Sequence, residues 1–380
     1  MAFAAVVSAK AQDINAVLKS VEQNNMELKA LLKGNEAADI ENKSQKHTRG
    51  PLDRIQPILS ERNKRYRKFR ASHYPGVRLP TLYGARKKAG QLQRNVLDMQ
   101  YQTARRDILV NAKKLCLDII NYNKQKQLLQ ERRKNADELL AMFELKFKNG
   151  DATSLELNKI KLDRMNLETE LVQADTKHAN AMQQLQALNG GQPIEVNMTE
   201  YPQAPADDEV TMYEKAVATD WTVRTAQASV LAAEQDVKVN KQSWIPKFEI
   251  GYRRNTEATM QAMVYLIGGS IPCLKQEQVK IAKARQTEAV IQHTNARINA
   301  ENSARTMINQ MKQLKASADA YDVPLMRQTL KLLRTAVENG EISVTEYYVE
   351  ADNIYKNMIT YMDIERQYQD ALTEIYKNEL

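Results

Sequence analysis

Apolar residues recur at alternating intervals of three and four positions along much of the chain, which is the period of α-helices that pack against other helices. Residues 84–147 contain no proline and, after Gly84, a single glycine. The pattern predicts one helix of about 96 Å at 1.5 Å per residue. An extra four-residue step at Ala112 interrupts the heptads and unwinds the supercoil locally. The apolar positions of this seam are Leu97, Tyr101, Ala104, Ile108, Ala112, Leu115, Ile119, Tyr122, Leu129, Ala136, Leu140, Phe143 and Phe147.

A second seam predicts a helix that returns along the first. Its positions are Ile160, Arg164, Leu167, Leu171, Ala174, His178, Ala181, Leu185 and Leu188. His178 has no second metal ligand near it in the sequence. We therefore interpret His178 as a satisfied interhelical side chain rather than a ligand.

The two long helical stretches end at matching turns, residues 147–153 and 337–343, which lie 190 positions apart. Asn-Gly at a helix end supplies a left-handed C-cap, and the Asp, Thr or Ser that follows supplies an N-cap for a returning helix. Ala37-Ala38 also matches Ala232-Ala233, and Pro80 matches Pro272. Because the offset is close to half the chain, the sequence predicts two copies of one unit, 12–191 and 209–380, joined by a linker at 192–208.

Each copy should contain a helix, an extended segment, a long helix, an Asn-Gly turn and a returning helix. In the second copy we expect these at about 209–242, 244–272, 274–338 and 343–378, with Pro324 bending the long helix. Within the extended segment Phe248, Ile250 and Tyr252 alternate with polar residues or glycine, and a second strand is expected near 264–271. This alternation fits a membrane barrel strand with one face to lipid, and it also fits an ordinary half-buried hairpin.

Composition agrees with a mainly α protein that has a small β part. Aromatic residues make up only 6% of the chain, with 12 Gly and 10 Pro, which is unlike a β-sandwich or a compact α/β enzyme. The mean hydropathy is −0.59, and the apolar stretch 258–274 is interrupted by Gly and Pro, so no transmembrane helix is expected. Cys116, Cys273 and the four scattered histidines form no metal or disulfide motif. We therefore expect that the protein binds no metal or cofactor, has no catalytic residue and is not an enzyme.

The net charge of +8 belongs to one segment. Residues 43–78 hold 11 Lys or Arg and 2 Asp or Glu, which leaves −1 for the rest of the chain. At the N-terminus, residues 1–11 form a short apolar run that ends in Ala9-Lys10-Ala11. We interpret it as the remnant of a secretory signal peptide cleaved before Gln12, and the alternative is a frayed apolar terminus.

With the repeat, the strands and the Asn-Gly turns, the chain resembles the TolC-like outer-membrane efflux proteins over roughly residues 13–377. The most specific segments are 147–188, 337–376, the strand entry at 244–252 and the exit at 268–272. The resemblance implies a homotrimer in which each chain gives four strands to a twelve-stranded outer-membrane barrel and its helices to a long periplasmic coiled-coil tunnel. Elementary physics favours an oligomer as well, because four strands cannot close a barrel and unpaired edges in lipid cost several kcal/mol per group.

The implied function is a passive duct for small molecules or metal ions in a tripartite efflux or type I secretion system of a Gram-negative bacterium. Its implied partners are a periplasmic adaptor (membrane fusion) protein, an inner-membrane pump such as a resistance-nodulation-division transporter, and outer-membrane lipid. The turns that would meet the adaptor are Asn149, Gly150, Asp151, Ala152, Thr153 and Ser154, and Asn339, Gly340, Glu341, Ile342 and Ser343.

Two further roles follow from the resemblance. Glu346 matches one of two acidic positions at the closed end of the tunnel, and the other falls on Val349 with Glu350 beside it, so Glu346 and Glu350 are the gate candidates. The alternative for Glu346 is a solvated carboxylate at a helix start. Phe248, Ile250 and Tyr252 are the lipid-facing candidates.

Residues 43–79 do not fit the family pattern, because they lack the alternation of a first hairpin. The segment could be a basic loop that binds anionic lipid or nucleic acid, or it could be disordered. We prefer a shifted reading frame, since the codons for residues 76–80 can encode Glu-Phe-Asp-Phe-Pro one base away. As written, the first hairpin should be missing. The alternative function for the whole chain is a coiled-coil scaffold or adaptor of the cell envelope without a pore. No nucleic-acid partner is expected, because the basic segment lacks a docking motif.

Overall fold

A computed structural model describes residues 13–47, 72–73, 76–77, 80–242, 247–254, 260–267 and 272–380. The expected secretory remnant at 1–11 and most of the atypical segment 43–79 lie outside the described residues. The chain forms two compact units, and each draws on both sequence repeats. The first unit takes its described residues from 1–29, 104–219 and 300–380, and the second unit from 30–103 and 220–299.

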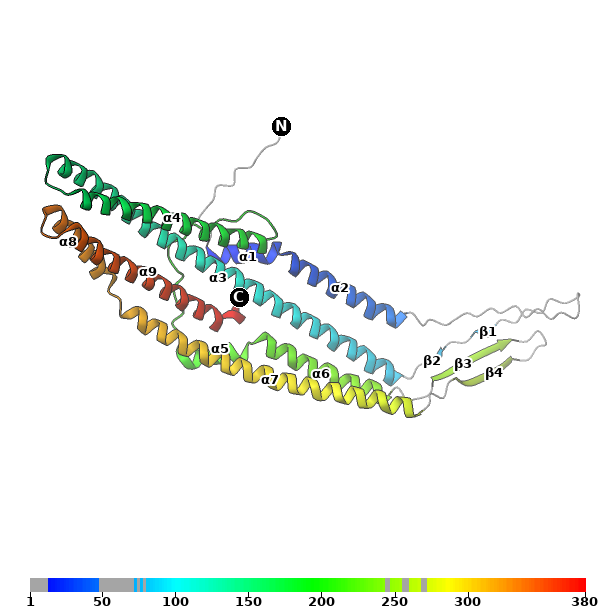
Figure 1. Cartoon of the computed structure of the whole chain (residues 1–380). Helices are drawn as coiled ribbons and strands as arrows, with labels where there is room; N and C mark the ends of the chain where they lie inside the picture. Colours follow the sequence, from blue (N-terminus) through cyan, green and yellow to red (C-terminus); the bar gives the residue numbers. More distant parts are fainter. Residues whose placement is uncertain are drawn as a thin grey trace, which may run out of the picture. The chain divides into compact units, whose positions relative to one another are not determined.

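The elements run in the order helix, strands, long helix, turn and returning helix, twice along the chain, as expected except for the strands of the first half (Figure 1). The first half holds α1 (Ile14–Asn24), α2 (Met26–His47), β1 (Ser72–His73), β2 (Gly76–Val77), α3 (Pro80–Asn149) and α4 (Ser154–Leu188). The second half holds α5 (Glu209–Ala218), α6 (Trp221–Gln242), β3 (Lys247–Arg254), β4 (Met260–Ile267), α7 (Pro272–Asp319), α8 (Val323–Asn339), α9 (Val344–Ile375) and the 3₁₀ turn η1 (Lys377–Glu379).

The long helix expected at 84–147 is confirmed as α3, a single helix of 70 residues. Pro80 stands at its first position, where the missing N–H costs no hydrogen bond. The buried side of α3 follows the predicted seam through Ala112 and Ile119, which are fully buried. The seam fails at its end, because Phe147 is 45% exposed.

The second long helix differs from the expectation of one bent helix over 274–338. α7 ends at Asp319 and a separate helix, α8, begins at Val323. The Asp322 carboxylate accepts a hydrogen bond from the backbone N–H of Leu325 at 2.9 Å. Pro324 therefore lies in the first turn of a new, capped helix instead of bending an old one, which is the position that proline tolerates best.

A second correction concerns the helix expected at 209–242, which is two helices. Asp220 separates α5 from α6 and accepts hydrogen bonds from the backbone N–H groups of Thr222 at 2.8 Å and Val223 at 3.0 Å. In the first half Asn25 separates α1 from α2 and accepts from the N–H of Leu28 at 3.0 Å. The two breaks lie 195 positions apart, the same offset as the paired alanines.

The strands pair as one antiparallel sheet around β3. β4 lies along one edge of β3 in a hairpin register that pairs Phe248 with Leu266, Ile250 with Val264 and Tyr252 with Ala262. The other edge pairs with β1 through His73 and Tyr252, and with β2 through Val77 and Phe248. Both short strands pair with β3 in the same register. No strand is expected here from the sequence, because the pairing partner lies in the other half of the chain.

The core of the first unit lies where the α3–α4 and α8–α9 hairpins meet. All four helices contribute buried residues to this core. These residues are Leu128, Leu139, Phe143, Leu157, Ile160, Val337, Val344, Tyr347, Tyr348, Ala351, Tyr355 and Met358. Among the described residues, none of the helices combines the length and the apolarity that a bilayer crossing requires.

The end of α4 packs closely against the break between α1 and α2. The Asn189 side chain accepts hydrogen bonds from Ser20 at 3.0 Å and Asn24 at 3.2 Å, and the Asn25 side chain donates to the carbonyl of Leu188 at 2.9 Å. Gly190 has a φ of +64°, and a Cβ placed there would lie 2.4 Å from the Asn24 carbonyl oxygen. Only glycine fits this contact without a backbone shift.

Candidate functional site

The two helical turns have the same backbone geometry. α3 is followed by Gly150 with a φ of +85°, and α8 by Gly340 with a φ of +77°. The N–H of Asp151 donates to the carbonyl of Lys146 at 2.8 Å, and the N–H of Glu341 donates to that of Ala336 at 2.8 Å. These bonds satisfy carbonyl groups that a helix end leaves free, and they require the left-handed glycine.

Both returning helices begin with a capping box. Thr153 accepts from the N–H of Glu156 at 3.3 Å, and the Glu156 carboxylate accepts from the N–H of Thr153 at 2.8 Å. Ser343 and Glu346 repeat these bonds at 3.1 Å and 2.8 Å. The pattern Ser or Thr followed three residues later by Glu is the local reason for these helix starts.

The structure brings the two turns together at one end of the first unit (Figure 1). The Lys146 ammonium donates to the backbone carbonyl of Glu338 at 2.8 Å. The Arg334 guanidinium donates to Asn135 at 2.6 Å and to Glu338 at 2.8 Å. A cation at the last carbonyl groups of α8 opposes the negative end of its dipole. The exposed surface of the site therefore consists of two similar turns held by one set of basic side chains.

The gate candidates lie on the first two turns of α9. Glu346 and Glu350 are both exposed, and Val349 between them is 53% exposed. The hydrogen bonds from the backbone and side chain of Ser343 lower the pKa of Glu346 below its ordinary value. The Glu346 carboxylate thus serves the helix start, which agrees with the alternative interpretation, and its role at a gate stays a prediction.

A Glu346→Gln variant tests the capping role through pH. A carboxyl whose pKa is lower in the folded than in the unfolded chain stabilises the fold above its unfolded pKa of 4.5, and this contribution is lost as the pH falls through the folded pKa. We expect the melting temperature of the variant to lie below that of the parent at pH 7 and to approach it under acid conditions. Thermal unfolding followed by circular dichroism between pH 7 and 3 measures the difference.

Glu350→Gln is the control, because Glu350 lies one turn beyond the box. Its melting temperature should follow that of the parent across the same range. A constant gap between Glu346→Gln and the parent at every pH would contradict the capping role of the carboxylate.

Beneath the turns lies a charged cluster that the sequence analysis missed. The Arg132 guanidinium on α3 is 2.8 Å from the Asp163 carboxylate on α4 and 3.5 Å from Asp352 on α9. It also lies over the Tyr355 ring, 4.9 Å from the centroid. Burial raises the pKa of Asp163 above its ordinary value, although Arg132 opposes that shift. No local motif signals this cluster, because it joins three helices.

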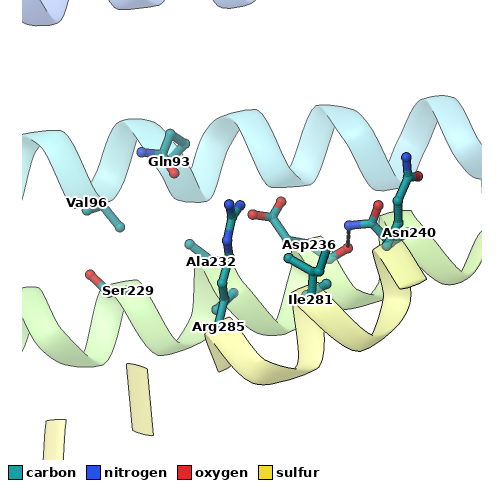
Figure 2. Close-up of a pocket in the computed structure, with 11 residues that line it drawn as sticks. Gln93, Val96, Ser229, Ala232, Asp236, Asn240, Ile281 and Arg285 are labelled. Atoms are coloured by element: carbon teal, nitrogen blue, oxygen red, sulfur yellow. Dashed lines mark hydrogen bonds between the residues drawn. The ribbon is translucent and has the colours of Figure 1, made fainter. Parts of the chain in front are cut away.

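The second unit has an open pocket of about 360 Å³ between α3, α6 and α7. Figure 2 shows the side chains of Asp236 on α6 and Arg285 on α7 in this space, and the Asn240 side chain donates to the carbonyl of Asp236 at 2.9 Å. Burial raises the pKa of Asp236, and Arg285 opposes the shift. The repeat-matched pair Ala232 and Ala233 lines this pocket, but none of the site residues expected from the sequence does.

In the register of the hairpin, Phe248, Ile250 and Tyr252 each pair with an apolar residue of β4. Contact of these three residues with lipid stays a prediction. Within the described ranges, no three His, Cys, Asp or Glu residues gather as potential metal ligands.

The sequence matches no protein-family model and no curated protein. Solved structures match it over 96% of its length. A membrane protein from Pseudomonas aeruginosa is 16% identical, with a TM-score of 0.76 over 89% of that chain. The outer membrane protein VceC from Vibrio cholerae is 14% identical, with a TM-score of 0.73 over 96% of that chain. The open state of the MtrE outer membrane channel of Neisseria gonorrhoeae is 11% identical, with a TM-score of 0.74 over 88% of that chain.

These likenesses extend over nearly the whole chain. TM-scores of 0.73–0.76 establish a common fold, at sequence identities of only 11–16%. The resemblance drawn from the sequence is confirmed at this level, and the chain has the fold of the TolC-like outer-membrane channels.

Proposed function

We propose that this protein is a passive outer-membrane duct of a tripartite efflux or type I secretion system. It acts as a homotrimer whose strands complete a twelve-stranded barrel and whose helices form a periplasmic tunnel. Solutes leave through the tunnel, and an inner-membrane pump supplies the energy through a periplasmic adaptor. The observation that carries the proposal is the likeness in fold to outer-membrane channels over 96% of the chain.

The paired turns suit the contact with the adaptor. Asp151 and Glu341 are exposed at equivalent positions, one residue after each C-cap glycine. The bonds from Lys146 and Arg334 fix the two turns relative to each other within the first unit. A partner would therefore meet two similar, preformed helix ends, which keeps the ordering cost of binding small.

The sheet supports the envelope part of the proposal. β3 is paired along both edges, by β4 on one side and by β1 and β2 on the other. The outer edges of such a sheet need further strands in lipid, because each unpaired backbone group there costs several kcal/mol. Strands from sister chains would supply them, with Phe248, Ile250 and Tyr252 toward lipid.

The test is transport in a Gram-negative host that lacks its own duct but retains pump and adaptor. We expect the parent chain to sediment with the outer membrane and to restore export. A variant that carries Asp151→Arg and Glu341→Arg should also reach the membrane, but its export should fall at least tenfold. Reversing two exposed charges on the turns should disrupt docking and leave the fold intact. Minimum inhibitory concentrations and membrane fractionation provide the measurements.

Glu214→Arg is the matched control, an exposed charge reversal on α5 in the same unit. It should export as the parent does. A chain that stays out of the outer membrane and exports nothing would favour the alternative, an envelope scaffold without a pore.

A further inference from the structure

A second pocket, of about 430 Å³, lies in the first unit away from the paired turns. Four segments line it, which are α3, the chain between α4 and α5, the last turn of α7 and the second half of α9. Its volume is in the range of sites that take small organic molecules. None of its lining residues belongs to the turns or to the gate candidates.

Tyrosine rings form much of the wall of this pocket. Tyr201, Tyr361 and Tyr368 line it, and all three are half-buried. The Lys124 ammonium lies 4.2 Å from the ring centroid of Tyr201, so the protein already places a cation on one of these rings. Among the described residues, no ammonium or guanidinium group lies over the rings of Tyr361 and Tyr368. These two rings can therefore receive the positive charge of a ligand.

The charges that line the pocket are mainly negative. Lys124 forms an ion pair with Glu365 at 2.8 Å, which leaves two carboxylates and one ammonium. The two carboxylates belong to Glu200 and Asp319 and the ammonium to Lys315, and all three residues are exposed. Within the part of the chain that the structure describes, none of the three forms an ion pair. The excess of carboxylates favours a cation over an anion.

The tyrosine hydroxyl groups report the same negative potential. The Tyr361 hydroxyl donates to the Glu365 carboxylate at 2.9 Å. Burial, this hydrogen bond and the charges of Glu365 and Asp319 raise the pKa of Tyr361 to about 12. Burial raises the pKa of Tyr201 as well, followed by the charge of Glu365, although Arg366 opposes the shift. A phenolate is disfavoured at these rings for the same reason that a ligand anion would be.

We propose that this pocket binds a small aromatic cation, which is a ring that carries a protonated or quaternary amine. The amine lies between the Asp319 carboxylate and the tyrosine rings, and the ligand ring fills the space between the pocket walls. Such a ligand contacts the last turn of α7 and α9 together, so it stabilises the folded chain by mass action. The inference does not rest on the proposed duct, because binding requires no pump, adaptor or membrane.

Isothermal titration of the purified full-length protein tests the proposal. The probe is benzyltrimethylammonium, which has one ring and one permanent positive charge. We expect saturable binding of one molecule per chain with a Kd of about 1 mM or tighter, and a melting temperature that rises with probe concentration. Benzenesulfonate, which has the ring but a negative charge, and tetramethylammonium, which has the charge but no ring, should each bind about tenfold more weakly or not at all.

Two variants assign the binding to this pocket. Asp319→Asn should weaken the binding of benzyltrimethylammonium about fivefold, and it should not harm the fold, because a carboxylate at the last residue of α7 opposes the helix dipole. Tyr368→Leu should weaken binding about tenfold, whereas Tyr368→Phe keeps the ring and should bind as the parent does. Glu214→Gln is the matched control for charge, since Glu214 is an exposed carboxylate of the same unit outside the pocket. Its affinity should equal that of the parent.

The other outcomes would overturn the inference. Equal affinities for benzenesulfonate and benzyltrimethylammonium would contradict the preference for a cation, and equal affinity for tetramethylammonium would contradict the role of the rings. Unchanged binding by Asp319→Asn would place the probe elsewhere, and this variant decides the matter even if Tyr368→Leu does not fold. A protein that exports solutes but binds no benzyltrimethylammonium would remove this inference and leave the duct standing.

Discussion

Replacing Arg132 by Leu should lower the free energy of unfolding by about 3–5 kcal/mol. The side chains of Arg132 and Asp163 are each 11% exposed, and their charged atoms lie 2.8 Å apart. Without the guanidinium, the Asp163 carboxylate remains buried without the ion-pair partner that offsets most of its desolvation. Denaturant unfolding followed by far-ultraviolet circular dichroism measures the loss.

Arg133→Leu is the matched control, one residue along the same helix. Its side chain is 41% exposed and lies 3.4 Å from Glu168. Exposed ion pairs of this kind contribute at most about 1 kcal/mol. If both variants lost a similar free energy of unfolding, burial of the Arg132–Asp163 pair would not be the cause of the loss.

The pH dependence gives a second test of the same pair. Burial raises the pKa of Asp163 in the folded chain. A carboxyl with a higher pKa in the folded than in the unfolded state costs stability at neutral pH, and the cost is relieved as the pH falls through the folded pKa. The Arg132→Leu variant should therefore regain part of its lost free energy of unfolding in acid. The double variant that carries Arg132→Leu and Asp163→Asn should regain that part already at pH 7.

The other large effect is expected for Phe143→Ala, at about 3–5 kcal/mol. Phe143 is 5% exposed in the core cluster where the two hairpins meet, and the Lys146 ammonium lies 5.0 Å from its ring centroid. Removing the ring leaves a cavity and weakens the contact between the hairpins. The denaturant midpoint should fall with no change in helix content before unfolding.

Phe147→Ala supplies the comparison, since it removes the same ring one turn along α3. Phe147 is 45% exposed, so we expect a loss of about 1 kcal/mol or less. If the two alanine variants were equally destabilised, the core would extend over Phe147 in solution.

The helices and turns could be predicted from the sequence because their causes are local. Apolar spacing fixed the extent of α3, and Asn-Gly followed by Thr or Ser fixed both turns. The same local rules explain the two errors. Pro324 was interpreted as a bend because Asp322 was not recognised as the N-cap of a new helix. Asp220, the N-cap of α6, was missed for the same reason. Phe147 keeps the heptad spacing, but it lies in the last turn of α3, where it is 45% exposed.

The parts of the site that depend on several helices could not be predicted. Lys146 and Arg334 looked like ordinary surface charges, although they link the two turns. Arg132 lies among other charged residues in the sequence, and only the meeting of α3, α4 and α9 makes it a buried cation. The pairing of β1 and β2 with β3 joins residues about 180 positions apart, a distance at which spacing patterns carry no signal.

The unequal chemistry of the two halves has a consequence for how the helices of one chain can be arranged. Arg132 on α3 lies 2.8 Å from Asp163 on α4 and 3.5 Å from Asp352 on α9, whereas the residues at the matching positions of the other returning helix are Asn353 and Leu162. If α4 and α9 exchanged places beside α3, the Arg132 guanidinium would be buried against an amide and a leucine with neither carboxylate to neutralise it. The divergence of the two halves thus fixes which returning helix lies on which side of α3.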